Sequence, residues 1–327
     1  MKLATYPNDT LDGELLVVSA DLTCAVYASA IAPSLIDAVQ HWEEVESALR
    51  SLYEQVNAGE AADTFAFDPE RCLAPLPRSP QWLDGSAYLN HGHLMERAFN
   101  TPPIPEFDTV PVMYQGASDD FRGPRADITL PSEADGIDFE GEFGAIVDEV
   151  PMGADADEAH GRIRLLVQLN DWSLRALGPR EMKSGFGFVQ AKPSTSFAPV
   201  AVTPDELGAD WCNGRVQLNL KVTRNGKRFG EPHGGEMNFS FGQLIAHAAR
   251  TRRLSPGTIV GSGTVSNVDR NAGSACISER RVIEIIDQGE AKTAFMAFGE
   301  QVRMEAVSSD GRAPFGVIDQ RILAPER

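Results

Sequence analysis

The segment at residues 137–147 constrains the fold most strongly, because apolar and acidic residues alternate along it. Odd-numbered positions carry apolar residues or glycine, whereas Asp138, Glu140 and Glu142 occupy even-numbered positions. Successive side chains of a β-strand point to opposite faces, so the pattern predicts a strand with these carboxylates on one face. Like charges at this spacing repel unless water or a cation compensates them. Two interpretations stay open: a solvated sheet edge, or an oxygen-rich site for a hard divalent cation.

Two later features favour the cation site. An apolar, strand-like run at 163–170 ends in Asn170-Asp171, where the acid is either a turn cap or a ligand. Further on, Lys192 stands in an apolar segment at 185–199. Such a lysine either extends its ammonium to the surface or is partly desolvated and requires an anion. The order of these features along the chain supports a site built from several carboxylates and one lysine.

The chain has 327 residues, which suggests two domains. Residues 1–75 are interpreted as a small N-terminal α/β domain, and the proline-rich passage at 74–80 as a linker. Beyond it, short strand-like runs alternate with Gly, Pro, Asn and Asp. We therefore predict an α+β, β-rich fold, with the larger domain at 80–327.

Local patterns predict the individual elements. A strand is expected at 14–19, followed by a helix that opens at Pro33-Ser34, with Ser34 and Asp37 spaced as a capping box and apolar residues at helical steps to Val56. Later elements are expected as a helix at 241–250 and as strands at 216–222, 258–265, 281–286 and 301–305, with a hairpin turn at 224–227.

Charge and composition exclude several classes of protein. The formal net charge is −18 and the sequence pI is near 4.7, which argues against binding to nucleic acid or to an anionic membrane. No run approaches the ~18 apolar residues of a membrane span, and the N-terminus lacks the apolar stretch of a signal peptide. The four cysteines lie far apart and are interpreted as reduced thiols. A cytoplasmic location is expected.

Five motifs together resemble the fumarylacetoacetate hydrolase family. They are Glu140-Gly-Glu142, Asn-Asp-Trp-Ser-Leu-Arg at 170–175, Ala-Lys-Pro-Ser-Thr-Ser-Phe-Ala-Pro at 191–199, Pro-Val-Met-Tyr-Gln-Gly-Ala-Ser at 111–118 and Gly-Ser-Gly-Thr-Val-Ser at 261–266. The motifs occur in the family's order and at suitable spacing. The resemblance covers about residues 80–325.

This resemblance implies a catalytic domain made of a rolled, mixed β-sheet, usually paired as a homodimer. It also implies a divalent metal, Mg²⁺, Mn²⁺ or Ca²⁺, held by Glu140, Glu142 and Asp171. The implied reaction is hydrolytic cleavage of a carbon–carbon bond in a 1,3-dicarbonyl or acylpyruvate-type substrate, so that the partner is a small 2-oxo acid or diketone, as in aromatic catabolism.

Further roles follow from the same motifs. Lys192 matches the family's active-site lysine, and Arg175 matches the arginine that follows the aspartate ligand and faces the substrate. Tyr114 and Thr264 match substrate-contact positions. These four assignments are implied by the resemblance and not by the spacing of the residues alone.

The expected general base is where the chain departs from the family. On the fumarylacetoacetase alignment, Asn90 takes the place of an aspartate ligand and Arg97 takes the place of the histidine base. Arginine cannot act as a base near neutral pH. On the alignment with the acylpyruvase and oxaloacetate decarboxylase branch, His91 takes the histidine position. We therefore predict His91 as the base, with His93 and Glu96, one helical turn apart, as the second choice.

Other functions stay open at this point. Relatives of this kind also act as hydratases, decarboxylases or isomerases of 2-oxo acids, and fold does not decide among these reactions. A metal-binding protein without catalysis is a further alternative, which Arg97 supports. Nucleotide binding is not expected, because the glycine-containing segment at 261–264 lacks the lysine of a phosphate-binding loop.

Overall fold

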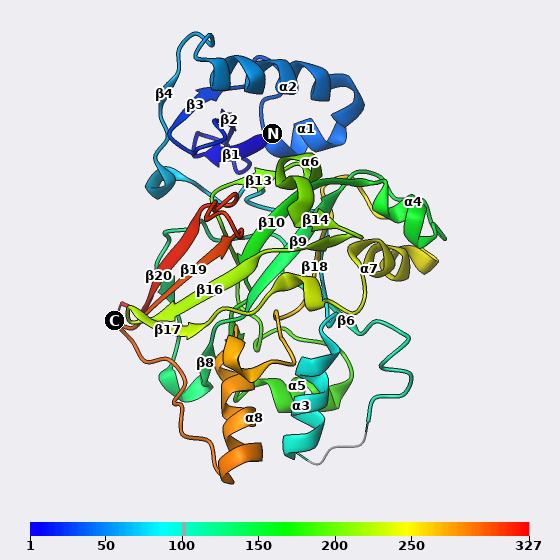
Figure 1. Ribbon diagram of the computed structural model, residues 1–327, viewed down its shortest axis with the longest axis vertical. Helices are drawn as coiled ribbons and strands as arrows, with labels where there is room; N and C mark the ends of the chain where they lie inside the picture. Colours follow the sequence, from blue (N-terminus) through cyan, green and yellow to red (C-terminus); the bar gives the residue numbers. More distant parts are fainter. Residues whose placement is uncertain (100–102, 327) are drawn as a thin grey trace.

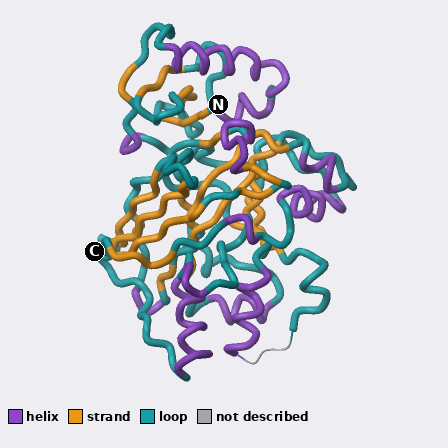
Figure 2. The backbone as a smooth tube through the Cα atoms, viewed as in Figure 1, coloured by secondary structure: helices purple, strands orange, loops and turns teal. Residues whose placement is uncertain are grey.

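The computed structural model describes residues 1–99 and 103–326, and a long mixed sheet forms its centre (Figures 1 and 2). The main path of this 11-stranded sheet runs β4-β3-β2-β1-β13-β10-β9-β18-β5-β6, and β12 pairs with β10 beside it. Its strands are β1 (Lys2–Tyr6), β2 (Glu14–Val18), β3 (Cys24–Tyr27), β4 (Phe65–Ala66), β5 (Trp82–Gly85), β6 (Met113–Gly116), β9 (Gly141–Val147), β10 (Ile163–Asn170), β12 (Ser196–Phe197), β13 (Ala201–Val202) and β18 (Ile259–Gly261).

A second sheet of five strands follows the order β17-β16-β19-β20-β7. Its strands are β7 (Ile128–Thr129), β16 (Asn219–Arg224), β17 (Lys227–Gly230), β19 (Gln301–Val307) and β20 (Val317–Leu323), and two short pairs join β8 (Ile137–Asp138) to β11 (Ser173–Leu174) and β14 (Trp211–Cys212) to β15 (Arg215–Val216). One hydrophobic cluster includes side chains of both large sheets, among them Phe143, Leu220 and Met304. The two sheets therefore share a core.

The helices lie around these sheets (Figure 2). They are α1 (Leu35–Gln40), α2 (Trp42–Ala58), α3 (Leu89–Phe99), α4 (Ala156–His160), α5 (Gly178–Ser184), α6 (Pro204–Leu207), α7 (Phe241–Ala248) and α8 (Ile277–Gln288). In Figure 1, α3, α5 and α8 lie together at the end of the molecule opposite the N-terminal strands. Among the described residues, no helix is long and apolar enough to cross a membrane.

The N-terminal region continues the central sheet instead of standing apart from it. Strand β1 pairs with β2 on one side and with β13 on the other. Helix α2 packs Trp42, Leu49 and Val56 against this region.

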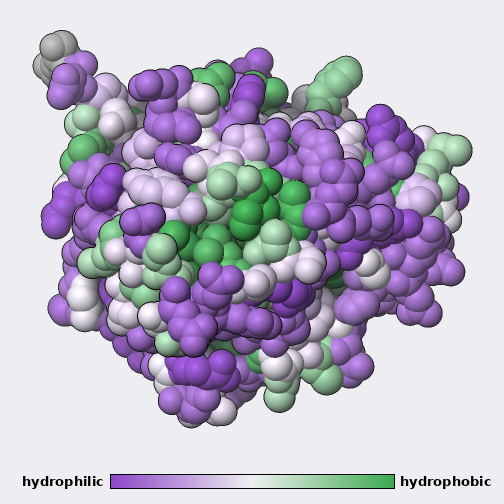
Figure 3. Space-filling view, turned by 90° about the horizontal axis from the view of Figure 1, so that it is seen from above, coloured by the Kyte–Doolittle hydropathy of each residue, from purple (hydrophilic) through white to green (hydrophobic). Residues whose placement is uncertain are grey.

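The face seen from above in Figure 3 is mostly hydrophilic, with one apolar area near its middle.

The helix predicted after Pro33 is interrupted once. Ser34 caps α1 by accepting a hydrogen bond from the backbone N–H of Asp37, as the spacing predicts. The backbone at His41 leaves the helical range, with φ −121° and ψ 32°, and α2 begins at the next residue. The apolar periodicity continues across this break, so the sequence pattern alone could not locate it.

The acidic segment lies in the interior of the protein. Strand β9 is hydrogen-bonded to β10 on one side and to β18 on the other. Glu140 is 5% exposed and Glu142 is fully buried. A solvated sheet edge is therefore excluded, and the charges must be compensated by neighbouring groups.

The strand predicted at 281–286 is wrong, whereas the hairpin predicted at 224–227 is present. Residues 281–286 belong to helix α8 and not to a strand, because Ile277 and Val282 bury one helical face and Cys276 caps the first turn. The predicted hairpin is present between β16 and β17, where Asn225 and Gly226 have φ values of 50° and 72°. All four cysteines are free. The predicted α+β, β-rich fold class is confirmed.

Candidate metal centre and active site

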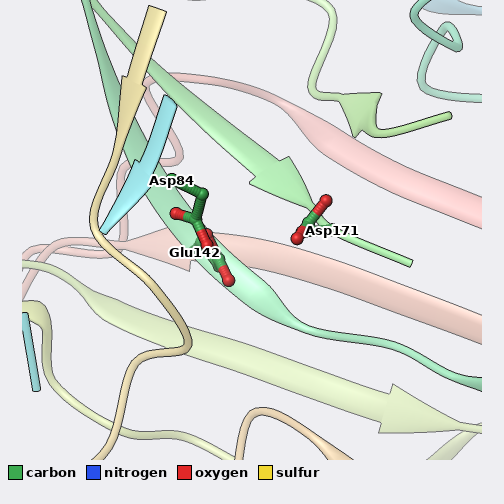
Figure 4. Close-up of side chains that lie close together, drawn as sticks. All are labelled: Asp84, Glu142 and Asp171. Atoms are coloured by element: carbon green, nitrogen blue, oxygen red, sulfur yellow. The ribbon is translucent and has the colours of Figure 1, made fainter. Parts of the chain in front are cut away.

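Three carboxylates from separate parts of the chain meet at the end of the central sheet (Figure 4). They belong to Asp84 on β5, Glu142 on β9 and Asp171 directly after β10, and one oxygen of each lies within 4.8 Å of the others. All three residues are buried. Oxygen atoms at this spacing can share one hard cation.

Two glycines, one at the end of β18 and one just after it, make room for Asp84. Strand β18 lies between β5 and β9, and Gly261 is opposite Asp84 in the parallel pairing. A Cβ atom on Gly261 would lie 2.3 Å from Asp84 Oδ1. At Gly263, which has φ +73°, the backbone N–H donates a hydrogen bond of 3.0 Å to the same oxygen. The Gly-Ser-Gly segment therefore lets the Asp84 side chain approach Glu142.

Glu142 is the carboxylate that lacks compensation. Neither of its oxygens receives a hydrogen bond from any residue that the structure describes. Burial and the charges of Asp84 and Asp171 raise the pKa of Glu142 well above its usual range. Burial and the charge of Asp171 also raise the pKa of Asp84, to about 8.

Lys192 compensates the neighbouring pair of carboxylates. Its ammonium lies 2.6 Å from Glu140 Oε1 and 2.6 Å from Asp171 Oδ2. Burial alone would lower the pKa of Lys192, but Asp171 and Glu140 raise it above its usual range. Burial likewise works against the charge on Glu140, yet Arg175 and Lys192 hold its pKa below the usual range. Lys192 is thus the desolvated cation that the sequence allowed, not a surface lysine.

Hydroxyl groups complete the surroundings of Glu140 and Asp171. Thr195 and Tyr114 donate to the two oxygens of Asp171, over 2.7 Å and 2.5 Å. Ser173 donates to Glu140 Oε1 over 2.5 Å, and Thr264 donates to Glu140 Oε2. Tyr114 and Thr264, predicted as substrate contacts, therefore face the same carboxylates that a metal and substrate would approach.

Arg175 is held between two acids. Its Nε donates to Asp138 over 2.8 Å, and its NH2 atom lies 3.1 Å from Glu140 Oε1. Although burial alone would lower the pKa of the guanidinium, Glu140 and Asp138 raise it. In this arrangement Arg175 compensates the charge of the site. Its predicted role in binding a substrate carboxylate stays a prediction.

Of the two histidines predicted as bases, His91 contacts a buried carboxylate, that of Glu279. His91 Nδ1 lies 2.8 Å from Glu279 Oε2, and Glu279 is 1% exposed in the first turn of α8. Because a carboxylate only accepts, this contact assigns the proton to Nδ1 and leaves the Nε2 lone pair free. Glu279 lies one helical turn after Cys276. The backbone of Cys276 forms an isolated β-bridge with Glu140, which places the start of α8 beside the lysine and its carboxylates.

The second choice of base lies at the surface. The His93 side chain is 51% exposed, with Nε2 3.2 Å from Asp108 and Nδ1 3.7 Å from Glu96. His93 is two helical positions from His91, so the two rings leave α3 in nearly opposite directions. The side-chain amide of Asn90 donates to Ser266 and to the backbone of Asn267, and does not join the cluster of carboxylates.

The donor set fits a divalent cation. The carboxylates of Asp84 and Glu142 lie next to that of Asp171. Among the described residues, no cationic side chain binds Glu142. Burial of a carboxylate without a partner is costly, and a bound Mg²⁺, Mn²⁺ or Ca²⁺ would remove that cost. Glu140, predicted as a ligand, is occupied by Lys192, Ser173 and Thr264 instead. Its role as a ligand stays a prediction.

Comparisons with known proteins show the family. Residues 81–323 match the model of the fumarylacetoacetate (FAA) hydrolase C-terminal family, and residues 1–78 match that of fumarylacetoacetase N-terminal domain 2. The chain belongs to the fumarylacetoacetate hydrolase family. Members that it resembles carry the names of hydrolases and isomerases.

Two kinds of relative illustrate the similarity. A 2,4-didehydro-3-deoxy-L-rhamnonate hydrolase from Sphingomonas sp. (strain SKA58) is 30% identical over 51% of this chain and 55% of its own length, so the chain spans about half of this curated relative. Maleylpyruvate hydrolase from Sphingobium sp. SYK-6 has a TM-score of 0.65 at 15% identity, over 99% of this chain and all of that chain. Another structure of that enzyme holds manganese(II) and pyruvate. A 2-hydroxyhepta-2,4-diene-1,7-dioate isomerase from Mycobacterium marinum has a TM-score of 0.61 at 15% identity, over the full length of both chains.

Sequence reasoning missed three residues of this candidate site. Asp84 stands alone in the short strand Trp82–Gly85, where an acid is indistinguishable from a turn residue. Glu279 lies on helix α8, two residues before the range 281–286 that was predicted to be a strand. Thr195 lies in the 191–199 motif, but no role was predicted for it. Only the Gly-Ser-Gly segment at 261–263 gave a signal for close approach.

Proposed function

We propose that this protein is a divalent-metal-dependent hydrolase that cleaves a carbon–carbon bond in a 1,3-dicarbonyl or acylpyruvate-type substrate. The observation that carries the proposal is Glu142, a buried carboxylate that no described residue donates to, directly beside Asp84 and Asp171. The relatives named above add support, since one is a maleylpyruvate hydrolase whose structure holds manganese and pyruvate. Glu142, Asp171 and Asp84 would hold the cation, with Glu140 as the further ligand that the family motif implies.

The cation would supply a Lewis acid that polarises the carbonyl oxygens of the substrate. His91 supplies the base: its Nε2 takes a proton from water while Glu279 accepts the hydrogen bond from Nδ1. The hydroxide so formed adds to a carbonyl carbon of the substrate. The carbon–carbon bond then breaks, and its electron pair stays on the leaving fragment as an enolate, to which His91 returns the proton.

Lys192 stabilises the negative charge that develops on oxygen during this step. Its ammonium is fixed by Glu140 and Asp171 before the substrate arrives, so little reorganisation is required. Tyr114 shares Asp171 with Lys192, and its ring lies 5.2 Å from the ammonium. These contacts support a role for Tyr114 in keeping Lys192 in place.

The decisive experiment is a substrate panel with metal-stripped and metal-restored protein. Acylpyruvates are expected to yield pyruvate and a carboxylic acid only after Mg²⁺ or Mn²⁺ is restored. Substitution His91→Gln should lower kcat by about 10²–10⁴-fold, the usual contribution of a general base, with metal affinity unchanged. The matched control is His93→Gln, which should leave kcat unchanged; the opposite result would make His93 and Glu96 the base pair.

An isomerase of 2-oxo acids is the second candidate. Solved structures of the same fold include a 2-hydroxyhepta-2,4-diene-1,7-dioate isomerase, and the base and lysine described here also suit proton transfer next to a carbonyl. Analysis of products from 2-oxo-enoates and oxaloacetate separates isomerase, hydratase and decarboxylase from hydrolase activity. Binding of metal without turnover of any panel substrate would contradict both candidates and favour a binding protein. A homodimer and a cytoplasmic location stay predictions, which sedimentation and cell fractionation test.

A further inference from the structure

One buried acid, Asp138, connects the two sides of the site. It lies on β8, is fully buried, and is not part of the carboxylate cluster. Its Oδ1 accepts a hydrogen bond of 2.7 Å from the backbone N–H of Ile277, and its Oδ2 accepts one of 2.9 Å from Ser278. The same Oδ2 accepts from Arg175 Nε over 2.8 Å. Three donors from two distant segments therefore converge on one carboxylate.

The first contact fixes the start of helix α8. Ile277 and Ser278 are the first residues of α8, and Cys276 accepts from the backbone N–H of Glu279. A negative charge at this end of a helix also interacts favourably with the helix dipole. The position of the Glu279 backbone is thus set by Asp138 and Cys276, and from there its side chain reaches His91.

The second contact leads to the other side of the site. Arg175, held by Asp138, lies 3.1 Å from Glu140, which in turn receives Lys192. Strand pairing supports this arm, because Ser173 is opposite Asp138 in the β8–β11 pair. Asp138 is consequently linked to both the base and the lysine without touching either.

We infer that Asp138 is a positioning residue that keeps the first turn of α8, and with it Glu279, in the place where Glu279 fixes the tautomer of His91. Through Arg175, the same carboxylate joins this arrangement to Glu140. Rotation or shift of the first turn would move the Glu279 carboxylate away from Nδ1. The inference rests on the proposed role of His91, but its first test requires no substrate.

The chemistry of the site explains why an aspartate is required. All three partners are donors, and an ionised carboxylate is an acceptor on both oxygens. Asparagine would keep one acceptor oxygen and turn its NH₂ group either toward Ile277 or toward Ser278 and Arg175 together. The substitution Asp138→Asn therefore preserves the size of the side chain but removes at least one of its accepted hydrogen bonds, which makes it the informative variant.

The first experiment records the imidazole ¹⁵N spectrum at about pH 8.5, where a free imidazole is neutral. The His91→Asn variant assigns the signals. The wild-type protein is expected to carry its proton on Nδ1, and Glu279→Gln, whose amide NH₂ can also donate to Nδ1, to weaken that preference. Asp138→Asn should shift the signals in the same direction as Glu279→Gln, and Arg175→Lys, which lacks the Nε donor, should shift them less. A wild-type spectrum for Asp138→Asn would overturn the inference.

A second helix provides the matched control. Ser240 caps α7 with a complete capping box, and its replacement by alanine should lower the stability of the protein. Ser240→Ala removes a helix cap without contact to Asp138 or Glu279, so the His91 spectrum should remain that of the wild type. An equal shift in this variant would show that general loss of stability, not positioning, causes the change.

Turnover supplies the second readout. Loss of a group that supports another functional residue commonly costs 10–100-fold, and Asp138→Asn is expected to lower kcat by about that factor with little change in KM. Its effect should be non-additive with that of Glu279→Gln, because both act on His91. Additive effects would contradict the inference. If the wild-type protein converts no panel substrate, the proposed function fails while the ¹⁵N spectra still decide the role of Asp138.

Discussion

The two halves of the site contain the same residue types but compensate their charges in opposite ways. In the lysine half, Glu140 and Asp171 are satisfied by Lys192 and by hydroxyl groups. In the acidic half, Glu142 has no donor among the described residues, and Asp84 has the backbone N–H of Gly263. Burial is equal in both halves, so it cannot explain the difference. The protein supplies its own cation to one half, and no described side chain supplies one to Glu142 in the other.

The largest effect is expected from removing the internal cation. Lys192→Met leaves Glu140 and Asp171 without their shared partner, and breaking a buried ion pair in this way costs about 3–5 kcal/mol. Urea unfolding of metal-free protein measures this loss. Added Mn²⁺ should restore part of the stability, and Lys192→Arg should retain most of it. A metal-free Lys192→Met variant as stable as the wild type would remove the distinction between the two halves.

The acidic half should respond in the opposite sense. Glu142→Gln removes an uncompensated charge, so the metal-free protein should gain stability, while its affinity for Mn²⁺ falls by about 100-fold or more, equivalent to about 2.7 kcal/mol. Calorimetric titration measures the affinity. Glu149→Gln, at an exposed ion pair with Arg253, is the control and should change neither quantity. Undiminished Mn²⁺ binding by Glu142→Gln would exclude Glu142 as a ligand.

A smaller effect is expected from a single donor of the lysine half. Tyr114→Phe removes the hydroxyl that donates to Asp171, and hydrogen bonds to charged groups contribute about 1.5–3 kcal/mol. Since Thr195 and Lys192 still donate to Asp171, the loss of stability should lie near the lower limit. Thermal unfolding of the metal-free variant tests this. A loss as large as that of Lys192→Met would mean that Tyr114, and not the ammonium, compensates Asp171.

The last effect concerns the dependence of stability on pH. The pKa of Asp84 is raised to about 8 in the folded protein, above the ordinary value of about 3.9, so the native state holds its proton more tightly than the unfolded chain. This contribution to stability is complete below about pH 4 and is lost as the pH rises toward 8, by at most about 1.4 kcal/mol per pH unit. Urea midpoints of metal-free wild type and Asp84→Asn between these values measure it.

Metal binding should show the reverse dependence on pH. A bound cation requires the ionised carboxylates, so the Mn²⁺ affinity of the wild type is expected to rise over the same range. Asp84→Asn should flatten both curves. Parallel stability curves for the variant and the wild type would contradict the raised pKa of Asp84.

Much of the lysine half could be predicted from the sequence. Alternation at 137–147 placed Glu140 and Glu142 together because a strand repeats every two residues, and the apolar segment around Lys192 gave a desolvated cation in need of an anion as one of two interpretations. Asp84 could not be found in this way. It joins the cluster through β18, which brings residues 82–85 beside residues 259–261, and no local pattern records such a long-range pairing.

The choice between His91 and His93 shows the same limit. Both occur on α3, and spacing alone favoured neither strongly. The difference comes from Glu279, on a helix whose β-branched residues resemble a strand in sequence but whose buried face and N-terminal cap stabilise a helix. Tertiary packing overrides local propensity here, and the functional contact depends on that packing.

The continuity of the central sheet has a practical consequence for anyone who dissects this protein. Strand β1 covers the edge of β13, and Arg50 and Tyr53 of α2 bind Asp205 and Glu206 of α6. Removal of residues 1–78 would expose the unpaired backbone N–H and C=O groups of β13 and the apolar side chains that pack against the N-terminal region. Exposed strand edges of this kind recruit other chains into aggregates. The shortened protein should therefore be handled as an aggregation hazard, and failure to obtain it in soluble form would carry no information about catalysis.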